Sequence, residues 1–229
     1  PTMTVIACPG RYDVQEGAWK SSADRSPFHT KFMIKSLTGT MKNEVRLLKA
    51  FLKANDIYGA EIAKQGFSGY VAEVLVLNFG SLENVLKEIS QLKAGQVIGK
   101  TTKQFDTKIV IIDPIDENRN LGAAISNENI GRFVLAARAF LRKPALSFFT
   151  IKKKSAKLDT KNVLVLSFRY KPRSPDIIWG QIKRAATSLA TQMNQAGFSV
   201  LKRSATISEN NVASLLFLLQ SKKLDDLQT

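Results

Sequence analysis

The sequence has 229 residues, with 34 lysines and arginines against 19 aspartates and glutamates, so its formal net charge is +15. Because 44% of the residues are apolar, we expect a packed core, and a fully disordered chain is excluded. The single cysteine, Cys8, excludes a disulfide framework and a cysteine zinc site, and the single histidine, His29, excludes a histidine-rich metal centre. No apolar run approaches the roughly 20 residues of a membrane-spanning helix. We therefore expect a soluble, cytoplasmic protein with no membrane partner and an acidic ligand, for which nucleic acid is the first candidate.

The positive charge is concentrated toward the C-terminus. Residues 1–150 contain 20 basic and 14 acidic side chains, whereas residues 151–229 contain 14 basic and 5 acidic ones. The basic residues near the start of this second part are Lys152, Lys153, Lys154, Lys157, Lys161, Arg169, Lys171 and Arg173. A lysine cluster is ordinarily a solvated surface, but so large an excess also favours contact with phosphate groups.

Up to residue 150 the sequence predicts mainly helices. Residues 3–7 have the pattern of a short strand, and residues 11–28 that of an irregular polar segment in which Pro27 keeps Ser26 extended. Apolar residues then recur at helical spacing over residues 43–55 and after Ser68, Ser81 and Ser126, three serines that can act as N-caps. The β-branched run at residues 108–112 predicts a buried strand.

The C-terminal part has a different pattern, which predicts a small β-α-β-β unit. Residues 163–168 alternate as a strand, residues 176–194 form a long amphipathic helix, and residues 198–207 and 212–219 are two further strands. We place the boundary between the two parts near Phe149. The predicted fold class is α/β (α+β), a helical central domain with a short strand followed by a small β-α-β-β sandwich.

Two nucleotide-binding signatures are absent. Residues 94–101 come close to a phosphate-binding loop, but Ala94 stands where that motif needs glycine, and we expect an ordinary helix-to-strand turn. No two glycines stand two residues apart, which excludes the dinucleotide fingerprint. No two carboxylates stand two residues apart either, and this spacing becomes important for the metal site below. His29 can act as a general base or simply as a hydrogen-bonding side chain, and the sequence leaves both open.

A polar loop is expected at residues 113–120, directly after the buried strand, where functional side chains are often placed. It contains three acidic residues, two amides and Arg119. Two interpretations are open. Arg119 can pair with Asp116 inside a self-contained polar loop, or its forked guanidinium can face a base edge or a phosphate.

Seven segments in order resemble the archaeal (class I) CCA-adding enzymes, which are tRNA nucleotidyltransferases. The resemblance covers residues 5–150 closely, and beyond them only the layout and the basic charge agree. The segments are residues 20–29, 43–49, 57–61, 66–70, 80–81, 112–116 and 119–120.

The resemblance implies a binding site for the incoming nucleotide, CTP or ATP. His29, Lys49 and Tyr58 match positions that hold the triphosphate, with Ser68 in the adjacent turn. Arg119 matches the arginine that reads the base, and Asp116 would orient it. The C-terminal part would bind the acceptor stem and 3′ end of tRNA through phosphates and shape, with Lys152, Lys153, Lys154 and Lys157 as the candidate RNA-binding residues.

The sequence departs from the family at its metal site. The chemistry of the family needs two carboxylates two residues apart that bind Mg²⁺, and no such pair is present. The position of a third carboxylate is Thr4, whose neutral hydroxyl is a poor ligand for a hard cation. We therefore expect no catalytic or metal-binding residue in these 229 residues, and Mg²⁺ would belong to the complete enzyme.

The resemblance divides the chain into a remnant of the catalytic head and hinge (residues 1–32), a central nucleotide-binding domain (33–149) and a truncated RNA-binding domain (150–229). We expect part of a CCA-adding enzyme that is inactive alone and that works with tRNA and with a catalytic head, which a separate chain can supply. One alternative is a stand-alone RNA-binding protein of this family without catalysis. Another is a scaffold protein whose basic charge serves only solubility.

Overall fold

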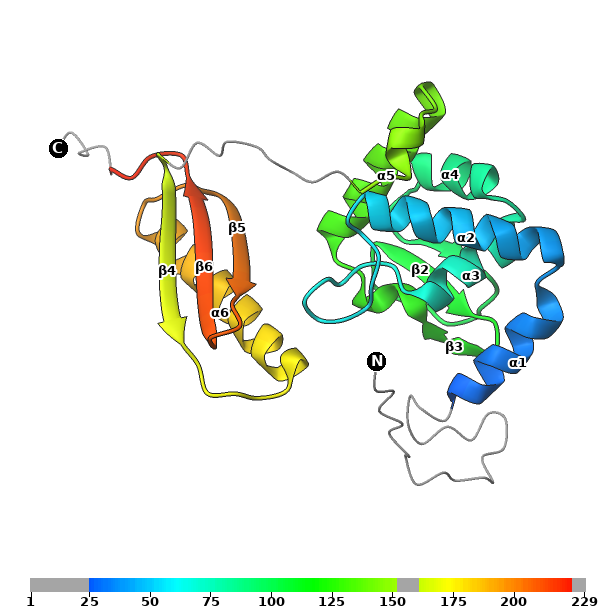
Figure 1. The fold of residues 1–229 in the computed structure, drawn as a ribbon, viewed down its shortest axis with the longest axis horizontal. Helices are drawn as coiled ribbons and strands as arrows, with labels where there is room; N and C mark the ends of the chain where they lie inside the picture. The colour runs from blue at the N-terminus through cyan, green and yellow to red at the C-terminus, as the bar shows by residue number, and fades with distance from the viewer. Residues whose placement is uncertain (1–24, 152–160, 224–229) are drawn as a thin grey trace. The chain divides into compact units, whose positions relative to one another are not determined.

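The computed structural model describes residues 25–151 and 161–223. Apart from residues 61–63, they form two compact units, one of residues 25–60 and 64–151 and the other of residues 161–223 (Figure 1). The strand expected at residues 3–7, Thr4 and the cluster Lys152, Lys153, Lys154 and Lys157 lie outside the described residues. No helix in the described ranges combines the length and the apolar character needed to cross a membrane.

The first unit combines five α-helices with a small three-stranded sheet (Figure 1). The helices are α1 (Ser26–Ser36), α2 (Gly39–Ala54), α3 (Gly69–Phe79), α4 (Leu82–Ser90) and α5 (Asn127–Arg142). The strands are β1 (Gln96–Ile98), β2 (Ile109–Asp113) and β3 (Asp116–Asn120), and two short 3₁₀ helices are η2 (Leu121–Ala124) and η3 (Leu146–Phe148). β2 is the central strand, parallel to β1 and antiparallel to β3.

Serine N-caps begin three of these helices, as predicted. The hydroxyl oxygen of Ser68 accepts from the backbone N–H of Val71, that of Ser81 from Asn84 and that of Ser126 from Asn129, over 3.0–3.2 Å. Each cap satisfies a backbone N–H group that has no partner inside the helix.

At the start of the first unit, one local prediction is wrong and one predicted helix is present but starts earlier. Pro27 does not keep Ser26 extended, because Ser26 is already the first residue of α1, and a proline fits the first helical turn, where its missing N–H has no role. The helix predicted over residues 43–55 begins earlier, at Gly39, since the hydroxyl of Thr38 caps it by accepting from the N–H of Met41. The first correction places His29 in the first turn of α1.

The prediction of a polar loop at residues 113–120 is also wrong. Asp113 is the last residue of β2, and residues 116–120 form β3, which pairs antiparallel with β2. The all-polar sequence of β3 hides the strand, because it follows neither the alternating nor the fully apolar pattern of a buried strand. The short turn between the strands brings Asp113 and Asp116 opposite each other in the hairpin.

Phenylalanine rings form much of the core of the first unit. Phe51 of α2 is fully buried, and its ring centroid lies 5.7–6.2 Å from those of Phe133, Phe140, Phe148 and Phe149. These rings join α2, α5 and η3. All five residues of β2 are buried, and its Ile109 and Ile111 belong to the same core as Phe51. Helix α3 packs against both α2 and β2, so the elements that carry the candidate site are held together.

The second unit is the predicted β-α-β-β arrangement. Its elements are β4 (Val163–Arg169), α6 (Pro175–Gln195), β5 (Val200–Ile207) and β6 (Val212–Leu219), and the sheet is antiparallel in the order β4-β6-β5. Helix α6 covers one face of the sheet (Figure 1), where Phe217 and Leu215 of β6 are buried against Ile182. On β4, Val165 is 50% exposed. The predicted α+β fold class is confirmed.

Candidate nucleotide-binding site

A tight loop brings Tyr58 to the start of α3. The N–H of Phe67 donates to the carbonyl of Ile57 over 2.8 Å, and Tyr58 and Phe67 form an isolated parallel bridge. Only glycine fits at position 66, because a Cβ there would lie 2.2 Å from the carbonyl oxygen of Ile57. The loop is therefore closed by backbone contacts between residues 57–59 and residues 66–67, which lead into α3.

Tyr58 and Lys49 meet at Gly69, the first residue of α3. A Cβ on Gly69 would lie 3.0 Å from the Tyr58 hydroxyl and 3.6 Å from Nζ of Lys49, so both groups stand close to the helix backbone. The Lys49 ammonium also lies 2.7 Å from Oε1 of Glu73, one helical turn further along α3. Because a helix N-terminus carries a partial positive charge, a lysine beside it makes a region that favours an anion.

Ser68 completes this group. Its oxygen accepts the capping bond from Val71, which leaves the hydroxyl proton available as a donor. We call Lys49, Tyr58, Ser68 and the backbone at Gly69 the α3 cluster. It offers an ammonium, two hydroxyls and the start of a helix within one small region.

A second group of polar side chains surrounds Asp113 at the end of β2. Its carboxylate is buried, with 0% of the side chain exposed. Oδ2 lies 2.8 Å from Nε2 of His29 and accepts from Nη1 of Arg119 over 3.1 Å. Oδ1 accepts from the Tyr70 hydroxyl over 2.9 Å and from the N–H of Ile115 over 3.2 Å. We call Asp113, His29, Tyr70 and Arg119 the Asp113 cluster.

Tyr70 connects the two clusters. It follows Gly69 in α3, and its ring stacks on that of His29 with centroids 4.0 Å apart. Burial, and next to it the negative charge of Asp113, raises the pKa of the Tyr70 hydroxyl far above its ordinary value. The hydroxyl therefore keeps its proton and remains a hydrogen-bond donor to Asp113.

The contact by which Asp116 would orient Arg119 is not formed among the described residues. Oδ2 of Asp116 accepts from Nε and Nη2 of Arg25 over 3.1 and 3.0 Å, and the carboxylate that contacts Arg119 is Asp113 instead. The antiparallel pairing of β2 with β3 places the two carboxylates opposite each other at one end of the hairpin, where each contacts a different arginine. Asp113 and Asp116 thus both contact the start of α1, Asp113 through His29 in its first turn and Asp116 through the N-cap residue Arg25.

The predicted triphosphate residues therefore come together around the first residues of α3. Lys49, Tyr58 and Ser68 form the α3 cluster, and His29 is joined to it through Tyr70, while Arg119 lies beyond His29 on the shared carboxylate. The candidate RNA-binding lysines and Thr4 lie outside the described residues. A separate surface hollow of about 460 Å³, lined by Thr107, Asn127 and others, includes none of the predicted residues.

Sequence reasoning missed three members of the site. Asp113 ends an otherwise apolar strand, and a charged residue at that place was the available signal for it. Tyr70 lies inside a segment that carries the family resemblance, next to Gly69. Glu73 gives no signal in the sequence, because its contact with Lys49 depends on how α2 and α3 pack.

Comparison with protein families gives two matches along the chain. The family model for the second domain of tRNA nucleotidyltransferase matches residues 43–150, and the model for the C-terminal domain of the CCA-adding enzyme matches residues 159–228. The first match contains both clusters except His29, and the second contains the whole described second unit.

Several archaeal proteins named CCA-adding enzyme are similar to the chain. The protein of Pyrobaculum neutrophilum is 38% identical over 207 residues, which are 89% of this chain and 49% of that relative. The protein of Saccharolobus solfataricus is 39% identical over 207 residues, covering 89% of this chain and 50% of the relative. That of Pyrobaculum aerophilum is 37% identical over 224 residues, covering 96% and 52%. The chain spans about half the length of the curated relatives it matches, and it belongs to the CCA-adding enzyme family of tRNA nucleotidyltransferases.

Proposed function

We propose that the first unit binds the incoming CTP or ATP in front of α3. Lys49, Tyr58, Ser68 and His29 would hold the triphosphate, and Arg119 would read the base. The observation that carries this proposal is the approach of the Lys49 ammonium and the Tyr58 hydroxyl to the same helix start, at Gly69. The family resemblance predicts these residues from separate segments of the sequence, and the proximity of three of them, Lys49, Tyr58 and Ser68, at the start of α3 supports the proposal.

The chemistry of these groups suits a triphosphate. Lysine supplies a compact charge that can turn toward any of several phosphate oxygens, and the hydroxyls of Tyr58 and Ser68 are neutral donors. The Glu73 carboxylate lies 2.7 Å from the Lys49 ammonium, so a phosphate would have to compete with it for Lys49. Because both groups of this pair are about one-quarter exposed, the pair contributes little stability, and the exchange costs little.

Isothermal titration of the chain with CTP tests this proposal. Lys49→Met is expected to weaken CTP binding about tenfold or more, because it removes a charge-assisted contact of about 1.5–3 kcal/mol. Glu73→Gln is expected to strengthen binding about threefold, since Lys49 no longer has to leave a carboxylate.

Lys42→Met is the matched control for these variants. Lys42 is exposed in the first turn of α2, so the variant makes the same charge change on the same helix without touching the α3 cluster. Equal losses of CTP affinity for Lys42→Met and Lys49→Met would contradict a site at α3, and so would an absence of CTP binding by the unchanged chain.

We also propose that the second unit binds the acceptor stem of tRNA, together with Lys152, Lys153, Lys154 and Lys157. The support is its charge, because residues 161–223 contain ten basic side chains and two acidic ones. Affinity for tRNA that falls steeply with salt would support phosphate contacts, and an absence of binding at low salt would favour the scaffold interpretation.

Nucleotide addition by the complete enzyme would need Mg²⁺, and neither the spacing of the acidic residues nor the described structure offers a site that fits this ion. Its 19 acidic residues include no two that stand two apart, and the described residues contain no group of three acidic, histidine or cysteine side chains able to hold a metal. We therefore propose that these 229 residues alone do not add nucleotides and contribute nucleotide and tRNA binding to CCA addition in the cytoplasm.

An activity assay separates this proposal from its alternative. Addition of C, C and A to tRNA by the purified chain with Mg²⁺, CTP and ATP would refute the proposed inactivity. Addition that appears only with a separate catalytic head would support a divided enzyme. A chain that binds tRNA but not CTP would support the alternative, a stand-alone RNA-binding protein of the family.

A further inference from the structure

We propose that Asp113 is a positioning residue that couples reading of the base to binding of the triphosphate. This inference rests on the proposed function, because it concerns how Arg119 and His29 act together in the same site. It assigns to Asp113 the orienting role that was predicted for Asp116, and it adds a second role toward His29.

The first observation is that both functional side chains contact the same oxygen. Nε2 of His29 lies 2.8 Å from Oδ2 of Asp113, and Nη1 of Arg119 lies 3.1 Å from the same atom. His29 comes from α1 and Arg119 from β3, which are 90 residues apart in the sequence. One carboxylate oxygen is therefore the point at which the two candidate ligand-binding side chains meet.

The second observation is that the carboxylate itself cannot easily turn. Its side chain is fully buried at the end of β2, and Oδ1 is held from the other side by the Tyr70 hydroxyl and the N–H of Ile115. A carboxylate with four donors in a buried position has a fixed orientation, so Oδ2 points in one direction. Asp113 is thus a rigid reference for two side chains that are themselves partly exposed.

The exposure of the two partners shows which of them can reach a ligand. The side chain of Arg119 is 34% exposed and that of His29 is 16% exposed, whereas that of Asp113 is not exposed. One terminal nitrogen of the guanidinium, Nη1, donates to Asp113, which leaves its other N–H groups available to a ligand. Asp113 itself therefore does not contact the nucleotide and acts through Arg119 and His29.

The shared oxygen makes the two contacts depend on each other. When a phosphate attracts the Nε2 proton of His29, Oδ2 loses one of its two donors and the Arg119 contact becomes its only side-chain contact. The guanidinium is then held more strongly in its reading position. Filling of the triphosphate site would in this way restrain the residue that selects the base.

A mutant cycle tests this coupling with CTP as the ligand. Asp113→Asn is expected to weaken CTP binding about tenfold in the otherwise unchanged chain, which corresponds to a coupling within the usual range for residues of one network. The same change should have less than about a twofold effect when His29→Asn and Arg119→Met are already present. A purely structural role of Asp113 predicts the same loss in both backgrounds.

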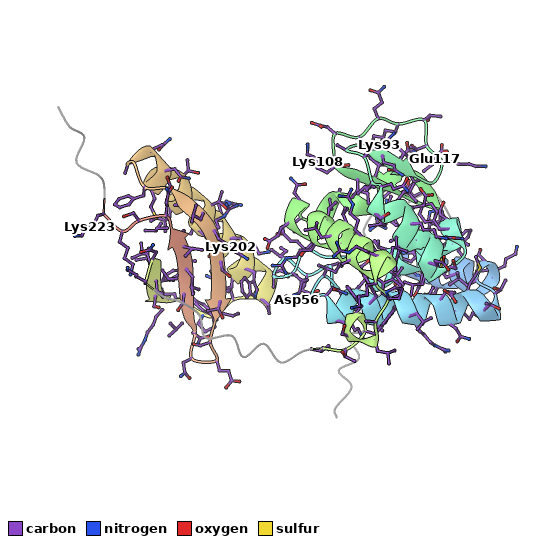
Figure 2. All side chains as sticks on the ribbon, turned by 90° about the horizontal axis from the view of Figure 1, so that it is seen from above. Asp56, Lys93, Lys108, Glu117, Lys202 and Lys223 are labelled. Carbon is purple, nitrogen blue, oxygen red and sulfur yellow. The ribbon has the colours of Figure 1, made fainter. Side chains whose placement is uncertain are left out.

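Glu117→Gln is the matched control, because it removes one negative charge from the same hairpin. Glu117 is exposed and lies with Lys93 and Lys108 at one end of the first unit, apart from Asp56 (Figure 2). CTP affinity of this variant should stay within about twofold of the unchanged chain, and a tenfold loss would mean that charge alone, and not the contacts of Asp113, accounts for the effect.

Tyr70→Phe provides a second variant in case Asp113→Asn does not fold. It removes the donor that holds Oδ1 and leaves the carboxylate in place. We expect about a threefold loss of CTP affinity that disappears in the background of His29→Asn and Arg119→Met.

The outcomes separate this inference from the proposed function. CTP binding by the unchanged chain, with equal effects of Asp113→Asn in both backgrounds, overturns the inference and leaves the nucleotide site standing. A lack of binding of both CTP and inorganic tripolyphosphate by the unchanged chain overturns the proposed function and the inference together.

Discussion

The positive charge of the two units is arranged in different ways. In the first unit the cations of the candidate site are held by carboxylates, Lys49 by Glu73, Arg119 by Asp113 and Arg25 by Asp116. In the second unit ten basic residues between positions 161 and 223 share only Asp176 and Glu209 as acidic neighbours in sequence. Held cations suit a small ligand whose atoms must be placed individually, whereas an unbalanced surface charge suits the repeated phosphates of RNA.

The cores of the two units also differ in how deeply their strands are buried. The first unit surrounds β2 with helices and a cluster of phenylalanine rings, so its strand is buried on both faces. The second unit has one helix on one face of its sheet, and several apolar side chains of β4, such as Phe168, are 38–50% exposed. The unit whose polar side chains are held in specific contacts is thus also the unit whose central strand is fully buried.

The largest effect is expected from a substitution that leaves a cavity in the core of the first unit. Phe51→Ala should lower the free energy of unfolding of the first unit by about 3–5 kcal/mol, because it leaves a cavity among four other phenylalanine rings. Amide hydrogen exchange, followed separately in α2 and in β6, measures the change in each unit. Phe217→Ala is the counterpart in the second unit, where Phe217 is equally buried. Loss of protection in both units from either change would show that they do not unfold separately.

A smaller effect is expected from removing charge in the second unit. Arg169→Ala, Lys171→Ala and Arg173→Ala combined should reduce the slope of log affinity for tRNA against log salt by up to about 3, roughly one for each phosphate that the chain can no longer neutralise. Filter binding over a range of salt concentrations measures this slope. Arg119→Met is the comparison in the first unit, expected to change CTP binding and leave the salt slope within about one. Similar slopes for both variants would remove the proposed division between the units.

The smallest effect concerns pH and the Tyr70 hydroxyl. Because the folded protein raises the pKa of Tyr70, the unfolded chain loses this proton near pH 10.0 while the folded chain keeps it. Stability should therefore fall as the pH rises above that value, and Tyr70→Phe should lose less stability over the same range. Urea unfolding of both proteins at neutral and alkaline pH gives the comparison. Equal losses of stability in the two proteins would show that Tyr70 is not buried against a negative charge.

Much of the fold could be predicted from the sequence, because its signals are local. Ser68, Ser81 and Ser126 stand directly before apolar residues at helical spacing, and the β-branched run before Asp113 has the composition of a buried strand. The β-α-β-β order of the second unit follows from similar patterns. Strand β3 was missed because its residues are all polar, and it is recognised only by its pairing with β2.

The site could be predicted in part. The family resemblance led to Lys49, Tyr58 and Arg119, but not to their partners. The contact between His29 and Asp113 joins residues 84 apart, and the contact between Arg25 and Asp116 joins residues 91 apart. No periodicity of the sequence encodes which of two nearby carboxylates faces which cation, because the choice depends on the register of the β2–β3 hairpin and on the position of α1.

Gly66 sets a limit on how the nucleotide site can vary. The carbonyl oxygen of Ile57 accepts from the N–H of the next residue, Phe67, and it already fills the space that a methyl group on residue 66 would need. Any other residue at position 66 would have to separate the two backbones and carry Tyr58 with one of them. The distance between the Tyr58 hydroxyl and α3 is therefore determined by a residue that has no side chain and needs no contact with the ligand.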